Sequence, residues 1–205
     1  MPKPEEILNG LQTIVNDYPV FAVIWHVVIY LLLIALIFRW QPSNKVLGAL
    51  LCLPLLSVAV FAWLTGNPFT GILFTAAAIL LLLFGLGASV QPVALSRWPF
   101  IVIGILMIVF GLVYPHFLKP GSILEYLYAS PVGLVPCPTL SVLIGMVLLL
   151  NGFGSQPITL SFIVLGLFYG VFGVFRLGVT LDVGLLIGTI ALLVQYLLPM
   201  KTPAG

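Results

Sequence analysis

The chain has 205 residues, of which 62% are hydrophobic and only 6% are charged. A water-soluble domain with a polar surface cannot be built from this composition, so the sequence predicts one integral membrane domain over residues 1–205. The net charge of +2 is scattered along the chain, which excludes the basic patch that a nucleic-acid-binding protein needs.

The first segment with a clear pattern is amphipathic and covers residues 4–17. Its apolar positions share one helical face and comprise Ile7, Leu8, Leu11, Ile14 and Val15. Glu5 and Glu6 suit the first turn of a helix, where the helix dipole favours negative charge. We expect a helix that lies on the membrane surface, the alternative being a short soluble tail.

Seven apolar segments follow, and a bilayer core of roughly 30 Å takes about 20 residues of helix. They are residues 19–38, 46–64, 71–90, 100–115, 132–150, 158–175 and 183–198. The fifth segment is interrupted by prolines and two others are short, so six full spans plus one broken helix is an alternative. The predicted fold is an all-α, polytopic transmembrane bundle of about seven spans.

The charges in the predicted loops indicate an orientation. With seven spans, one side of the membrane carries four cations and no acid, namely Arg39, Lys45, Arg97 and Lys201. The other side carries three cations together with all five acids. The positive-inside rule therefore predicts a multi-pass arrangement with the N-terminus outside and the C-terminus inside.

The fifth segment contains Pro136 and Pro138 on either side of Cys137. A proline within a helix lacks an N–H and leaves a carbonyl without its partner, and lipid offers no replacement. We therefore expect a helix that begins inside the membrane, with Cys137 at the cap and Pro138 at the first position. This short helix would shape an outward-facing cavity, which makes Pro136, Cys137, Pro138 and Thr139 candidate cavity residues.

Both histidines are predicted to lie in the same half of the membrane as Cys137. His26 is about seven residues below the start of the first span, and His116 follows the fourth. Histidine and cysteine bind transition metals and haem iron, so His26, His116 and Cys137 form a candidate metal site. The alternatives are a hydrogen bond from His26 to a neighbouring helix, an interfacial His116 and a buried, inert Cys137. Cys52 is expected in the core, too far in depth for a disulfide to Cys137.

The last predicted outer loop carries Arg176 and Asp182. Arg176 can satisfy the carbonyls that end the sixth span, and Asp182 can cap the seventh. The two side chains can also pair, or line an outer vestibule. In the preceding outer loop, the segment from Ser122 to Glu125 has the capping-box pattern of a short helix.

Two short motifs near the C-terminus carry a resemblance. They are Pro-Cys-Pro-Thr at Pro136 to Thr139 and Leu-Gly-Val-x-x-Asp at Leu177 to Asp182. Over its second half the chain resembles a bacterial multi-spanning membrane family that is known only as a domain of unknown function. The resemblance implies a location in the bacterial inner membrane and leaves the activity unassigned.

These patterns favour a permease or transporter-like protein for a small solute, with the broken helix lining its cavity. One alternative is a membrane-embedded metal or haem ligand protein of redox type, using Cys137 with His26 or His116. Another is a structural subunit of a larger membrane complex. The partners expected are the lipid bilayer and either a small solute or a membrane protein. No cofactor is required, and no pair of nucleophile and base points to an enzyme.

Overall fold

The computed structural model describes residues 3–87, 93–119 and 122–198, and these residues fold into helices joined by turns, without a strand. The helices are α1 (Pro4–Asp17), α2 (Pro19–Ile37), α3 (Asn44–Leu64), α4 (Pro68–Gly87), α5 (Trp98–Leu112), α6 (Tyr126–Ala129), α7 (Pro136–Leu149), α8 (Gln156–Val171) and α9 (Asp182–Leu197). Short turns precede α6 (η1, Ile123–Glu125) and α8 (η2, Asn151–Gly154), and the π-helical turn η3 (Phe172–Arg176) follows α8.

Proline sets the start of several helices. α1, α2, α4 and α7 each begin at a proline, because the first helical position needs no N–H and proline already has the required φ. α1 has the predicted bounds, and its location on a membrane surface stays a prediction. The predicted third span, residues 71–90, begins three residues too late, and its last three residues lie outside the described part of the chain.

Four helices of the described chain are long and apolar enough to cross a membrane. They are α2, α3, α4 and α8 continued through η3, with 18 to 21 residues each. α5, α7 and α9 are also apolar but have only 15, 14 and 16 residues. The structure is thus consistent with membrane insertion, and the count of seven spans stays a prediction.

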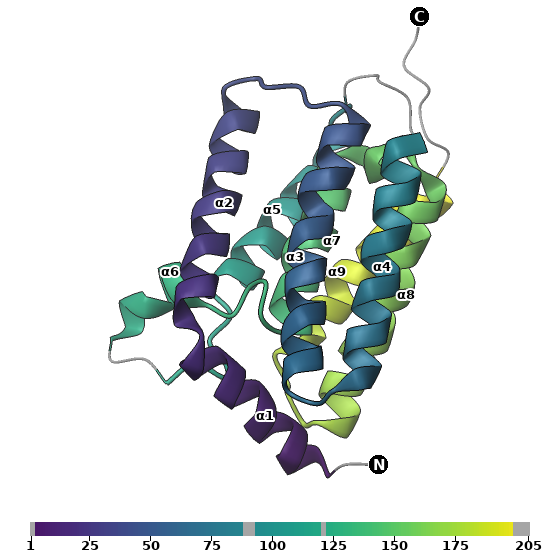
Figure 1. Cartoon of the computed structure of the whole chain (residues 1–205). Helices are drawn as coiled ribbons and strands as arrows, with labels where there is room; N and C mark the ends of the chain where they lie inside the picture. Colours follow the sequence, from purple (N-terminus) through teal and green to yellow (C-terminus); the bar gives the residue numbers. More distant parts are fainter. Residues whose placement is uncertain (1–2, 88–92, 120–121, 199–205) are drawn as a thin grey trace, which may run out of the picture.

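The short helix α7 is the centre of the bundle. All of its 14 residues are buried, and it packs against α3, α5, α8 and α9 (Figure 1). A helix that is apolar on every side belongs in such a position. α5 approaches it closely at glycines, since a Cβ on Gly145 would lie 2.6 Å from the Gly104 carbonyl oxygen. Small residues at such contacts are typical of membrane helix packing.

Helices α1 and α2 lie at the edge of this bundle. α1 crosses one end of it and contacts the loop after α5, where the Asn16 amide donates to the Phe117 carbonyl at 3.0 Å, and α2 runs beside α3 with a visible separation (Figure 1). Only 17% of the apolar stretch of α2 is buried, compared with 56% for α3. Three hydrogen-bonding side chains attach α2 to other elements, namely Trp25, His26 and Tyr30.

Candidate functional site

The N-terminus of α7 differs from the prediction by two residues. Val135 is the N-cap in an extended conformation and Pro136 is the first helical residue, so Cys137 is the second helical residue rather than the cap. The reason is that the first-turn N–H groups have no intrahelical acceptor, so prolines at the first and third positions, Pro136 and Pro138, cost no helical hydrogen bond. The helix is half-length, as predicted, and spans about 20 Å.

A tight turn leads into α7, and Thr139 holds it. The N–H of Gly133 donates to Thr139 Oγ1 at 2.8 Å, and the same hydroxyl donates to the Val135 carbonyl at 2.7 Å. Gly133 has φ +77°, which disfavours any other residue. Its missing side chain also makes room for Trp25, whose indole nitrogen donates to Ser57 Oγ at 3.0 Å.

Replacing Gly133 by alanine is expected to destabilise the protein by about 3 kcal/mol, because the left-handed backbone is strained and the new Cβ would lie 2.0 Å from the Trp25 ring. Gly66 has φ +71° with no atom within 4 Å of an added Cβ, so Gly66→Ala carries the backbone cost alone, about 1 kcal/mol. Thermal unfolding of both variants in detergent checks the difference. Equal losses would show that the Trp25 contact contributes nothing.

On the face of α7 opposite this turn, three polar side chains meet inside the bundle. Tyr114, just beyond the end of α5, donates its hydroxyl hydrogen to Asp182 Oδ1 at 2.7 Å. Cys137, in the first turn of α7, donates its thiol hydrogen to Asp182 Oδ2 at 3.3 Å. Asp182 is 1% exposed and Tyr114 is fully buried. We refer to Tyr114, Cys137 and Asp182 as the carboxylate cluster.

Two features of the surroundings partly offset the cost of burying the Asp182 carboxylate. Asp182 is the first residue of α9 and Cys137 is in the first turn of α7, and helix N-termini carry positive partial charge. Gly173 in η3 makes room for the carboxylate, since a Cβ there would lie 1.8 Å from Asp182 Oδ2. Because both carboxylate oxygens accept hydrogen bonds, the cost of burying this group is partly offset.

The predicted roles of Asp182 and Arg176 need correction. Leu181 is the N-cap of α9 and no side chain caps it, so Asp182 does not act as the cap. Asp182 is paired with Tyr114 and Cys137 instead of Arg176, which is exposed at the end of η3. The physical reason is that Gly173 opens a space on the inner side of the loop, and Asp182 fills it.

His26 and Cys137 have separate hydrogen-bond partners, and His116 packs against aromatic rings. The Nδ1 atom of His26 lies 2.8 Å from the Ala22 carbonyl oxygen, and its Nε2 atom lies 2.9 Å from that of Leu112, the last residue of α5. The ring of His116 packs on Phe117, and burial lowers the pKa of His116 below its usual value. Within the described residues, no three His, Cys, Asp or Glu side chains form a group that could hold a metal ion.

Cys52 lies in the core, as the sequence predicts, and is a free thiol that donates to the Ala49 carbonyl. Cys137 is also a free thiol. At the short turn before α6, the Ser122 hydroxyl accepts a hydrogen bond from the Leu124 N–H, which agrees with the predicted helix start at this position. Neither Cys52 nor Ser122 adds a group to the carboxylate cluster.

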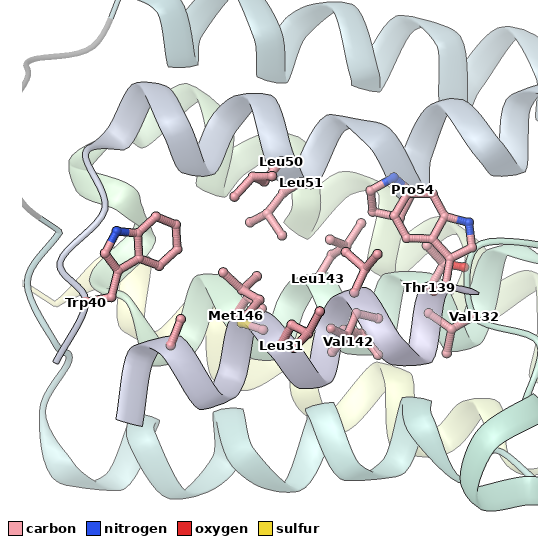
Figure 2. A pocket seen from close by; sticks show the side chains of 15 residues that line it. Leu31, Trp40, Leu50, Leu51, Pro54, Val132, Thr139, Val142, Leu143 and Met146 are labelled. Atoms are coloured by element: carbon pink, nitrogen blue, oxygen red, sulfur yellow. The ribbon is translucent and has the colours of Figure 1, made fainter. Parts of the chain in front are cut away.

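A cavity of about 250 Å³ lies on the other side of α7, between α2, α3 and α7. Figure 2 shows Trp40 at one end, Val132 and Thr139 at the other, and leucines, Val142, Met146 and Pro54 along the sides. Of the candidate cavity residues, only Thr139 lines it. The lining is apolar because the hydroxyl of Thr139 is engaged with the backbone.

Sequence reasoning missed Tyr114 and Gly173. A tyrosine at the end of an apolar span usually belongs to the interfacial aromatic belt, so its position in the chain suggests an outward side chain. Depth along a helix can be counted from the sequence, whereas the direction around its axis here depends on packing.

The chain matches no family model, no curated protein and no solved structure in our comparisons.

Proposed function

We propose that the protein is a multi-pass membrane permease that moves a small solute together with a proton, and that Asp182 is the proton-binding group. The observation that carries this proposal is the buried Asp182 carboxylate, which accepts hydrogen bonds from Tyr114 and Cys137. An ionisable side chain inside a membrane bundle is costly, so such residues usually serve an ion or proton pathway.

The short length of α7 supports a helix that starts within the membrane. α7 is seven residues shorter than α3, which corresponds to about 10 Å. Its C-terminal end is level with that of α9, because the side chain of Gln195 donates to the Leu148 carbonyl at 3.2 Å. Cys137 and Asp182 lie in the first turns of α7 and α9, and half-helix N-termini of this kind form the binding sites of many transporters.

A proton suits the carboxylate cluster better than a metal ion does. Its groups are one carboxylate, one phenol and one thiol, each of which can exchange a proton. A metal site needs several ligand atoms with free lone pairs, and the described residues offer no such group here. The metal and haem alternative has no comparable support, because His26 and His116 are engaged elsewhere.

The permease proposal is tested in liposomes loaded with a pH-sensitive dye. Inward gradients of monocarboxylates, amino acids and polyols are applied in turn to liposomes with the protein and to empty ones. We expect one class of solute to move protons faster with the protein present, and Asp182→Asn to remove the difference because it cannot release a proton. If every solute gives the rate of empty liposomes, the permease proposal fails.

A further inference from the structure

The cavity between α2, α3 and α7 can hold a ligand that the carboxylate cluster cannot. It lies on the other side of α7 from Asp182, and it is lined almost entirely by hydrocarbon. An apolar cavity of about 150 Å³ stays dry and takes up benzene-sized molecules, and drug-sized ligands fill about 300 to 1,000 Å³. At about 250 Å³, this cavity suits part of a single hydrocarbon chain.

The position of α2 gives such a chain a route into the cavity. α2 forms one wall from Trp25 to Ala35, but most of its surface faces away from the bundle. Val28 and Leu31 on this helix line the cavity and are also exposed, so in a membrane the edge of the cavity meets lipid. A lipid chain can therefore reach the cavity from the side, without crossing the polar surface of the bilayer.

The charge at one end of the cavity indicates the headgroup. Trp40 lines that end. Two cations flank Trp40 in the sequence, Arg39 in the loop after α2 and Lys45 in the first turn of α3. The sequence between these helices contains no acid. This loop is also on the predicted cytoplasmic side, where membranes expose anionic lipids, and each nearby cation strengthens binding of an anionic surface by roughly fivefold.

We propose that the α2–α3–α7 cavity binds one acyl chain of an anionic phospholipid, whose headgroup lies against Arg39 and Lys45. The apolar lining selects the chain, and the two cations select the negative headgroup over a zwitterionic one. This site goes beyond the proposed permease function and is tested without it, because the measurement needs only the protein and lipid.

Tryptophan quenching tests the site directly, since Trp25 and Trp40 line the cavity. The parent for this experiment carries Trp63→Phe and Trp98→Phe, which removes two lipid-exposed indoles. It is reconstituted in phosphatidylcholine vesicles containing increasing fractions of brominated phosphatidylglycerol or brominated phosphatidylcholine. We expect quenching by brominated phosphatidylglycerol to saturate and to need a roughly 25-fold lower lipid fraction, because two cations act on its headgroup.

Two further variants separate the cavity from the headgroup contact. Ala35→Phe fills the cavity, so we expect it to abolish the part of the quenching that saturates with lipid fraction, which is the saturating component. Ala76→Phe, on the exposed face of α4, is expected to leave this component unchanged. In the double variant Arg39→Gln and Lys45→Gln, we expect the two brominated lipids to quench equally. The proposal is overturned if the parent is quenched equally by both lipids, or if Ala35→Phe, eluting as a monodisperse protein, retains the saturating component.

Discussion

Replacing Gly145 by valine is expected to destabilise the protein by about 4 kcal/mol and to leave little folded material. Gly145 is buried at the contact between α5 and α7, where an added Cβ would lie 2.6 Å from the Gly104 carbonyl oxygen and 2.7 Å from a side-chain carbon of Ile108. The carbonyl belongs to the backbone, so the two helices would have to separate. The yield and thermal stability of monodisperse protein measure the loss.

Gly10 provides the control for this substitution. It lies in α1, where an added Cβ meets no atom within 4 Å, so Gly10→Val changes only the local helix preference. We expect its stability to remain within about 1 kcal/mol of the parent. If Gly145→Val folds as well as Gly10→Val does, α5 and α7 are not in the close contact described above.

Replacing Gly173 by alanine is expected to break the carboxylate cluster and to cost about 3 kcal/mol. The new Cβ would lie 1.8 Å from Asp182 Oδ2, so the carboxylate must turn away and lose its hydrogen bonds from Tyr114 and Cys137. Each hydrogen bond to a charged group contributes about 1.5 to 3 kcal/mol. Thermal unfolding in detergent measures the total.

A second variant shows whether Gly173→Ala acts through Asp182. Tyr114→Phe removes the hydroxyl that donates to Asp182 Oδ1 and is expected to cost about 2 kcal/mol in the parent. In the Gly173→Ala background this hydrogen bond is already lost, so Tyr114→Phe should cost almost nothing more. Fully additive losses would contradict the displacement of Asp182.

The helical class and the order of the elements could be predicted from the sequence, because apolar segments and prolines mark where membrane helices lie. The short helix in the fifth segment is the clearest case, since prolines such as Pro136 and Pro138 are favoured in the first turn of a helix. Its first residue was misplaced because either proline can occupy the first position. The extended conformation of Val135 decides between them.

The partners of each site residue could be predicted only in part. Cys137 and Asp182 are both candidate cavity residues from the sequence, but the patterns do not indicate that their side chains contact each other. Their contact joins residues 45 positions apart and depends on the space that Gly173 leaves for the carboxylate. His26 illustrates the same limit of sequence patterns, because its contact with Leu112 joins residues 86 positions apart.

The proposed role of Asp182 is tested most directly by infrared titration of the reconstituted protein. Protonated and ionised carboxyl groups absorb at different frequencies, and the chain has only five acidic side chains. We predict that changing the bulk pH reversibly protonates one buried carboxyl group, and that this signal is missing in Asp182→Asn but present in Glu125→Gln. A titration that is identical in the parent and in Asp182→Asn would contradict a proton-binding role for Asp182.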